Sequence, residues 1–270
     1  MSTLGHPRLH LRCTGSTNDR ARELALGGAP HGTLVTAAEQ SAGRGRGGRR
    51  WSAPAGSALL MSLLLRTPPS LLPMIAAVAV CDVAGEDTRI KWPNDVVVES
   101  APPTATATAP SSEERPEDLR QGTREPQLAK LAGILIEGRP QEGWAVLGVG
   151  LNVAVELDEL PVELRAGGAG RSATSPLPAA TLGRPREAIE PTLSLLLEAL
   201  ERRLAEPMEA TLAAWRSRDA LLGREIEWTA GRGRARGIDG TGRLVVALAD
   251  GGQTTLGAGE VHLQAPGERS

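Results

Sequence analysis

The first helix of the chain is predicted from a polar start, an amphipathic run and a glycine stop. Residues 19–25 alternate charged and apolar side chains at helical spacing. Thr17 or Asn18 can cap the first turn of this helix, and Gly27 and Gly28 can end it. We therefore expect a short surface helix here.

Apolar runs then predict two core strands and a buried helix. Residues 33–38 and 57–65 are apolar runs of strand length. Residues 41–50 between them are rich in glycine and arginine, and a loop between two core strands is a usual place for function. Residues 71–83 are alanine-rich and apolar on most faces, which is typical of a buried helix.

The amino-acid composition changes twice in the middle of the chain. A short strand is expected to end near Val98, and residues 99–127 then consist largely of Pro, Ala, Thr and Glu. Because this segment lacks large apolar residues, we interpret it as a disordered insertion. Residues 131–137 and 144–153 are short apolar runs joined by a Gly/Pro turn, and they predict two further strands.

The C-terminal part predicts two helices and a separate β domain. A flexible Gly/Ala/Pro stretch at 166–185 precedes helices expected at 186–205 and 208–222. Short alternating runs punctuated by glycines follow, and they indicate a small β-barrel of about five strands. The expected domains are therefore residues 1–222 and residues 223–270.

Composition limits the classes of function. The net charge of −2 over 270 residues gives no general basic field for binding nucleic acid. The chain has neither a run of about 18 apolar residues nor a secretory signal sequence, so a cytoplasmic protein is expected. Cys13 and Cys81 are far apart and suggest neither a disulfide framework nor a zinc site. Both are expected to be buried.

Rare residue types mark candidate functional positions. Phe and Tyr are absent, and two of the 30 basic residues other than histidine are lysines, namely Lys91 and Lys130. Asparagine occurs as Asn18, Asn94 and Asn152. In a chain that otherwise uses arginine, a retained lysine indicates a position where arginine would not serve.

Residues 40–51 combine glycine with arginine. Glycine lets backbone N–H groups approach a ligand, and guanidinium groups bind phosphate or carboxylate with two hydrogen bonds. The segment is interpreted as an anion clamp. It is not a P-loop, because the Gly-Lys-Ser/Thr ending is missing. RNA binding by an Arg/Gly segment remains an alternative.

Two lysine-containing segments add to this interpretation. Residues 91–95 place a cation, an indole, a proline and two polar side chains in five positions. They could equally form a strand that ends in an Asn/Asp turn. Lys130 opens an apolar strand that contains Gly133. A lysine at a strand end is usually solvated surface, but arginine would serve there equally well.

In this order the segments resemble the biotin protein ligases, also called biotin–acetyl-CoA-carboxylase ligases. The Gly-Arg-Gly-Arg and Lys-Trp-Pro-Asn-Asp sequences are specific in combination. The resemblance covers nearly the whole chain except the insertion after Val98. The matched stretches are residues 16–18, 40–51, 91–95, 130–133 and 148–152.

The resemblance implies a fold and a reaction. The fold would be an α/β (α+β) catalytic domain with a mixed sheet and flanking helices, followed by a small SH3-like β-barrel. The reaction would join biotin to AMP from ATP, with Mg²⁺, and then pass the biotinyl group to a lysine. The acceptor would be the biotin carboxyl carrier protein or domain of an acyl-CoA carboxylase.

The resemblance also implies the residues of the site. The expected catalytic residues are Lys130, Arg46 and Asp95. The expected biotin-binding residues are Ser16, Thr17, Asn18, Gln40, Gly43, Arg44, Gly45, Arg46, Lys130 and Gly133. The expected ATP-binding residues are Arg46, Arg49, Trp51, Lys91, Asn94, Lys130 and Asn152. Asp95 would serve the acceptor lysine or order Lys91, and no protein ligand for a metal is identified.

The sequence departs from the family pattern in three places. Family members that repress transcription carry an N-terminal DNA-binding domain, whereas residues 16–18 here lie near the start of the chain. A ligase without repressor activity is therefore expected, one that binds neither DNA nor a membrane and that could form a homodimer. Gly47 replaces a bulkier or basic residue of the loop. The insertion is expected to tolerate deletion.

Two other functions remain open at this point. A lipoate-type ligase shares the fold and the acyl-adenylate chemistry, although the two specific motifs favour biotin. An RNA-binding protein could combine the loop with the basic residues 231–236. Those residues are also compatible with an exposed hairpin.

Overall fold

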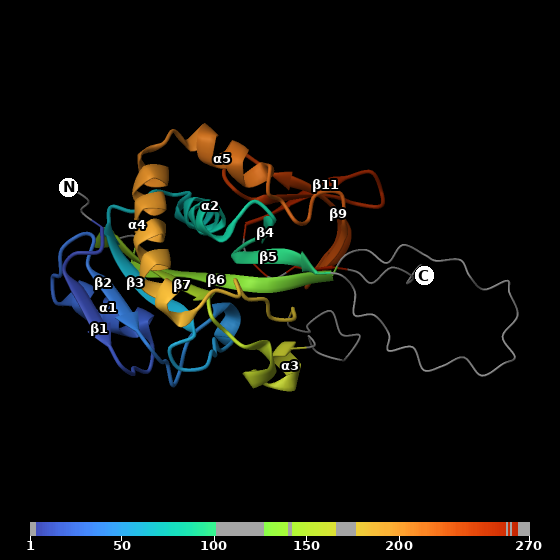
Figure 1. The fold of residues 1–270 in the computed structure, drawn as a ribbon. Helices are drawn as coiled ribbons and strands as arrows, with labels where there is room; N and C mark the ends of the chain where they lie inside the picture. Colours follow the sequence, from blue (N-terminus) through green and yellow to red (C-terminus); the bar gives the residue numbers. More distant parts are fainter. Residues whose placement is uncertain are drawn as a thin grey trace, which may run out of the picture.

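A seven-stranded mixed sheet forms the centre of the molecule (Figure 1). The structure is a computed structural model, and it describes residues 4–100, 127–139, 142–165, 177–257, 259 and 261–263. The pair β1–β2 is parallel, whereas the other neighbouring strands of this sheet are antiparallel. In order across the sheet the strands are β1 (Arg8–Leu11), β2 (Leu34–Ala37), β3 (Ala58–Arg66), β7 (Trp144–Asn152), β6 (Gln127–Arg139), β5 (Asp95–Ser100) and β4 (Thr88–Lys91).

Different helices cover the two faces of the sheet. On β3, Leu59 and Leu63 belong to the large core with α2 (Leu72–Ala84) and α4 (Ile189–Ala205). Leu64 points to the opposite face and packs with α1 (Thr17–Leu26). Because β3 is buried on both faces, its sequence is a continuous apolar run rather than an alternating one. The predicted strand at 57–65 and the predicted helix at 71–83 are confirmed.

The start of α1 corrects the predicted cap. The helix begins at Thr17 with Ser16 in the N-cap position, and the Ser16 side chain makes no capping hydrogen bond. Thr17 and Asn18 therefore lie inside the first turn. Their side chains contact other strands and loops instead of the helix backbone, which is why local capping rules misplaced them.

The insertion is shorter at both ends than predicted. Glu99 and Ser100 extend β5, and Gln127 begins β6, where Ser100 pairs with Gln127. Cross-strand pairing holds these residues in a hairpin despite their polar composition. Residues 101–126 lie outside the described part of the chain, as do residues 166–176 of the predicted flexible stretch. Residues 162–165 form the short helix α3 (Val162–Arg165).

Helix α5 (Met208–Arg216) ends six residues before the predicted stop at position 222. The next segment pairs with β4: Ile90 N donates to Arg218 O at 2.7 Å, and Ala220 N donates to Ile90 O at 2.9 Å. This strand-like pairing replaces the last turns of the helix. It also fixes the chain as it enters the second domain.

Asp219 in this segment predicts a pH dependence of stability. Burial raises its pKa to about 6, above the ordinary value of 3.8. The protonated carboxyl therefore favours the folded state, and this contribution is lost as the pH rises from about 4 through about 6. Asp219→Asn is expected to lose less stability than the wild type over this range. Thermal unfolding at pH about 4 and about 7 measures this difference, and equal losses would contradict it.

The C-terminal domain is a five-stranded antiparallel sheet of the SH3-like type, which confirms the predicted fold class. It packs against the turn between β4 and β5, where Trp92 is buried and its Nε1 donates to Gly242 O at 3.1 Å. The strands, in order across this sheet, are β11 (Gln253–Leu256), β10 (Leu244–Ala247), β9 (Gly231–Ile238), β8 (Glu225–Trp228) and β12 (His262–Leu263).

The two cysteines differ in their surroundings. Cys81 is buried on α2, as predicted, and burial raises the pKa of its thiol to about 11. Cys13 is exposed, so the prediction of burial is wrong for it. It lies in a bend after β1, outside the core. Among the described helices, none is both long and apolar enough to pass through a bilayer.

Candidate active site

The candidate site lies on the face of the central sheet that carries α1. Along β3, Leu64 packs under α1 and Leu60 packs in a cluster with Trp51. Ser62 lies between them and is fully buried. Since buried hydroxyls need hydrogen-bond partners, Ser62 marks the place where polar groups of the site meet.

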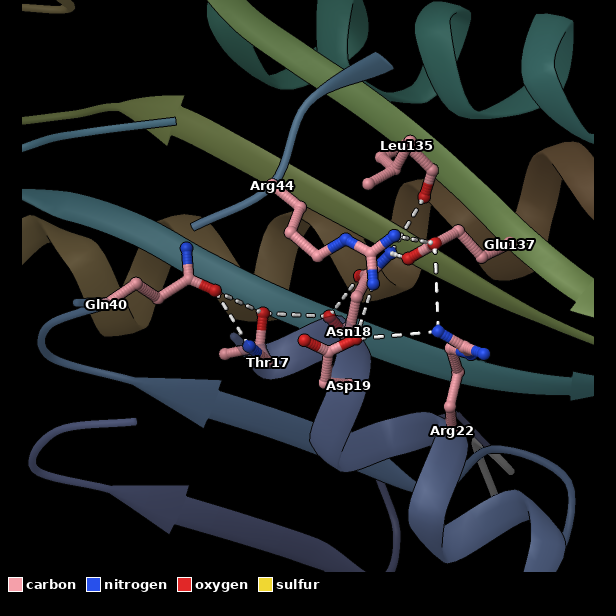
Figure 2. Close-up of polar contacts among 9 residues, drawn as sticks. Thr17, Asn18, Asp19, Arg22, Gln40, Arg44, Leu135 and Glu137 are labelled. Carbon is pink, nitrogen blue, oxygen red and sulfur yellow. Dashed lines mark hydrogen bonds and ion pairs between the residues drawn. The ribbon is translucent and has the colours of Figure 1, made fainter. Parts of the chain in front are cut away.

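A chain of hydrogen bonds joins the first turn of α1 to this serine. Ser62 Oγ lies 2.6 Å from Asn18 Oδ1 and 2.8 Å from Thr17 Oγ1. Figure 2 shows Gln40 beside Thr17: Gln40 Oε1 accepts from Thr17 N at 2.7 Å and lies 3.0 Å from Thr17 Oγ1. The predicted biotin-binding residues Thr17, Asn18 and Gln40 therefore form one cluster, with neutral side chains throughout.

The side chain of Arg44 lies over the same cluster (Figure 2). Its guanidinium lies 2.7 Å from Asp19 Oδ1 and 2.8 Å from Glu137 Oε1. Glu137 Oε2 also accepts from Asn18 Nδ2 at 2.9 Å. The predicted biotin-binding residue Arg44 thus has its charge balanced by two carboxylates, on α1 and β6. Its side chain holds the loop on the sheet.

The Gly/Arg segment folds as a short hairpin. Trp51 N donates to Gly43 O at 3.0 Å, and Gly45 N donates to Arg49 O at 2.7 Å. The tip is a single 3₁₀ turn, Arg46–Gly48, whose two glycines have positive φ. Glycine adopts such angles without strain, which explains the composition of the tip. Gly43 itself is buried.

Trp51 lies flat against two glycines of neighbouring strands. A Cβ at Gly150 would come 2.5 Å from the indole, and a Cβ at Gly133 would come 3.1 Å from it. The two glycines are paired partners on β7 and β6. Side chains at these positions would push the indole away, so the glycines form its seat.

Gly150→Ala is therefore expected to destabilise the fold by about 1–3 kcal/mol, because the added methyl group overpacks the indole of Trp51. Gly240→Ala is the matched control. Its Cβ would meet no atom within 4 Å, and its stability should change by less than about 0.5 kcal/mol. Chemical denaturation of both variants measures the difference. Equal stabilities would contradict the proposed seat.

Lys130 forms an ion pair beside this tryptophan. Its Nζ lies 2.7 Å from Asp95 Oδ1 and 5.7 Å from the centre of the Trp51 ring. Asp95 is 7% exposed and pairs with Gly133 in the next strand. Lys130 N donates to Pro178 O at 2.6 Å, which anchors the lysine backbone. The structure thus joins a half-buried ammonium, a carboxylate and an indole.

An open cleft with an empty volume of about 420 Å³ adjoins this ion pair. Asp95 lies on its wall, so the cleft and the ion pair form one site. The C-terminal domain contributes one side, where Lys91 Nζ donates to Val261 O at 2.7 Å. The residues around the cleft are Arg46, Gly47, Arg49, Lys91, Pro93, Asn94, Asp95, Gly259 and Val261.

The two asparagines predicted to bind ATP, Asn94 and Asn152, both donate hydrogen bonds to backbone carbonyls. Asn94 Nδ2 donates to Ile134 O at 2.9 Å, and Asn152 Nδ2 donates to Ala180 O at 2.8 Å. Asn94 lines the cleft. Asn152, at the end of β7, is buried, and its contact fixes residues 177–182 against the sheet.

Sequence reasoning missed Ser62, Asp19 and Glu137. Ser62 did leave a signal, because it is the one polar residue inside the apolar run of β3. The two acidic residues left none, since either could be an ordinary solvated side chain. Their role becomes visible only when α1, β6 and the loop are placed together.

Comparison with known proteins identifies the family. The model of the biotin/lipoate A/B protein ligase family matches residues 10–153, more than half of the chain. The chain belongs to the biotin/lipoate A/B protein ligase family. A second model, the C-terminal domain of biotin protein ligases, matches residues 221–263, which places this ligase-family chain nearer the biotin branch.

Curated relatives agree with this assignment. The bifunctional ligase/repressor BirA of Bacillus spizizenii is 33% identical over 174 residues, 60% of this chain and 45% of that protein. The chain thus spans about half the length of this relative. The biotin–[acetyl-CoA-carboxylase] ligase of Mycobacterium tuberculosis is 32% identical over 274 residues, 93% of this chain and 87% of the relative.

Solved structures share the fold. The biotin protein ligase from Aquifex aeolicus in complex with biotin and ATP aligns with a TM-score of 0.68 and 22% identity. The alignment covers 96% of this chain and 99% of that one. Both domains of this ligase-family chain therefore have counterparts in a solved structure.

Proposed function

We propose that this protein activates biotin with ATP to biotinyl-5′-AMP and then transfers the biotinyl group to a lysine of a biotin carboxyl carrier protein or domain. The observation that carries the proposal is the Lys130–Asp95 ion pair at the edge of a cleft lined by Arg46 and Arg49. Two anions must meet there, and these cations reduce their repulsion.

In the first half-reaction an oxygen of the biotin carboxylate attacks the α-phosphorus of ATP. A new P–O bond forms, and the bond to the departing pyrophosphate breaks. Lys130 is compact enough to lie between the carboxylate and the α-phosphate, whereas Arg46 and Arg49 would bind phosphate oxygens through their guanidinium forks. The assignment of Lys91 and Asn94 to ATP rests on their place on the cleft wall.

Neutral side chains suit the other end of biotin. The ureido group is uncharged and has both N–H donors and a carbonyl acceptor. Thr17 and Gln40 offer a hydroxyl and an amide, held in place by Ser62. Trp51, seated on Gly133 and Gly150, would form an apolar wall between this cluster and Lys130.

Mg²⁺ would enter with ATP rather than occupy a protein cage. Within the described part of the chain no group of three metal-binding side chains is present, and Asp95 is the carboxylate of the cleft wall. Magnesium is commonly bound by substrate phosphates, water and one or two carboxylates. The ion supplies charge neutralisation at the phosphates, and the residues named above bind and orient the substrates.

In the second half-reaction the amine of the acceptor lysine attacks the acyl carbon of biotinyl-5′-AMP. An amide bond forms, AMP leaves, and the attacking nitrogen gives up a proton. Asp95 is our candidate to accept that proton, or else to order Lys91. Carboxylates are common general bases when they lie within hydrogen-bond reach.

Pyrophosphate release from ATP and Mg²⁺, with biotin or lipoate as acyl substrate, tests the proposal. Biotin-dependent release is expected. Release with lipoate alone would favour the lipoate-type ligase, which the family model on residues 10–153 also includes. Salt-dependent RNA binding without biotin or ATP would favour the RNA-binding alternative.

The finer statements about this protein remain predictions. They are a cytoplasmic location, a possible homodimer, and ligation without repressor activity or DNA binding. Sequence-specific binding to an operator DNA would contradict the last of these.

A further inference from the structure

Glu137 joins two parts of the site through one carboxylate. It lies near the end of β6, and its side chain is 17% exposed. Oε1 lies 2.8 Å from the guanidinium of Arg44, and Oε2 accepts from Asn18 Nδ2 at 2.9 Å. The glycine-rich hairpin and the first turn of α1 are therefore held by the same group.

The charge of this group fixes the direction of the neighbouring hydrogen bonds. An ionised carboxylate can only accept, so the amide nitrogen of Asn18 must face Glu137. Leu135 O, 3.5 Å from the same nitrogen, favours the same orientation. The amide oxygen of Asn18 then faces Ser62 Oγ at 2.6 Å, and Ser62 must donate to it.

The same constraint on donors and acceptors extends to the side chains proposed to bind biotin. The one hydroxyl hydrogen of Ser62 goes to Asn18, so at 2.8 Å from Thr17 Oγ1 the serine oxygen can only accept. The single hydroxyl hydrogen of Thr17 therefore points to Ser62, and Thr17 Oγ1 cannot also donate to Gln40 Oε1, which lies 3.0 Å away. Gln40 Oε1 is held by the backbone N–H of Thr17, which turns the amide nitrogen of Gln40 away from that contact. Each side chain thus has one donor and acceptor arrangement, which starts at Glu137.

The packing around Asn18 prevents an easy alternative. Asn18 is 4% exposed, and a Cβ at Gly148 would lie 2.2 Å from its Oδ1. The amide is therefore pressed against β7, with little room to shift. Its orientation depends on its partners, Glu137 on one side and Ser62 on the other.

We propose that Glu137 is a positioning residue that sets the orientation of Asn18 and, through Ser62, the donor and acceptor pattern that Thr17 and Gln40 present to the ureido group of biotin. This inference rests on the proposed function. Glu137 would contact no substrate. It would act through the neutral side chains and through the place of Arg44.

Exchanging the donor and acceptor groups between positions 18 and 137 tests this role. Glu137→Gln removes the charge and lets the amide of Asn18 turn over. The double variant N18D/E137Q restores an acceptor-only group next to Ser62, with an amide donor opposite it, at unchanged net charge. Glu142→Gln is the matched control, because Glu142 lies just before β7 and pairs with Arg139 and Trp144.

Calorimetric titration with biotin, without ATP, measures binding by the full chain. Glu137→Gln is expected to raise the Kd for biotin about tenfold, the effect of losing one charge-assisted hydrogen bond. The Kd for ATP should change less than about twofold. N18D/E137Q should restore the Kd for biotin to within about threefold of the wild type, and Glu142→Gln should leave it unchanged.

Several results would overturn the inference. One is equal biotin binding by the wild type and Glu137→Gln, and another is a double variant that binds no better than the single variant. If Glu137→Gln does not fold, a folded N18D/E137Q that fails to bind biotin overturns it, and one that binds biotin supports it. A wild-type protein without biotin binding would instead overturn the proposed function, and this inference with it.

Discussion

Lys130→Ala is expected to lower the rate of biotin-dependent pyrophosphate release by about a hundred- to a thousandfold. That is the usual cost of removing one fixed charge or donor from a site where charge develops. The ammonium of Lys130 is held 2.7 Å from Asp95 and lies over Trp51, so its position is set before the substrates arrive. No other lysine could replace it, since Lys91 donates to a carbonyl of the C-terminal domain.

Two further variants separate charge from shape at this position. Lys130→Met keeps the length of the stem and should be as slow as the alanine variant. Lys130→Arg keeps the charge but broadens the group that must fit between two anions, so it should recover only part of the rate. Asp95 loses its ion-pair partner in Lys130→Ala and Lys130→Met, so the thermal unfolding of both variants must be measured together with the assay. Wild-type rates in a folded Lys130→Met protein would contradict the assigned role.

Apolar pattern alone predicted most of the core. The strand at 57–65 and the helix at 71–83 appear in the structure close to their expected bounds, because burial on both sides leaves a continuous apolar run. Strand β1 was not predicted. Its four residues, Arg8–Leu11, are half exposed at the edge of the sheet and carry no apolar run.

Local rules failed where a distant partner decided the structure. Thr17 and Asn18 looked like helix caps, but their side chains contact Gln40 and Ser62. The segment after Arg216 looked helical, but it pairs with Ile90 instead. In each case the competing contact lies far along the chain and leaves no trace in the local sequence.

The sequence pointed to some residues of the candidate site and missed others. Scarcity drew attention to Lys130 and Asn18, since this chain uses lysine and asparagine so rarely. Glu137 could not be found by scarcity, because the chain has 32 acidic residues. It lies 119 positions from Asn18, and only the pairing of β6 with β7 brings it to α1.

Arg46→Gly is expected to release biotinyl-5′-AMP and to label lysines on unrelated proteins. Arg46 lies on the cleft wall at the tip of the hairpin, in a turn with two glycines of positive φ. A closed tip would keep the acyl-adenylate bound and exclude water. Loss of the guanidinium removes a bidentate contact to phosphate, so the intermediate should dissociate at least about tenfold faster.

Arg50→Gly is the matched control for this experiment. Arg50 lies in the same hairpin and carries the same charge, but it donates to Ser41 O and is not among the residues that line the cleft. Serum albumin is added in excess, and the biotin attached to it, detected by streptavidin blotting, measures the biotinyl-5′-AMP that has been released. Strong labelling by Arg46→Gly with weak labelling by Arg50→Gly would locate retention at the cleft. Equal labelling would assign it to the net charge of the hairpin, and no labelling by either would contradict a retention role for Arg46.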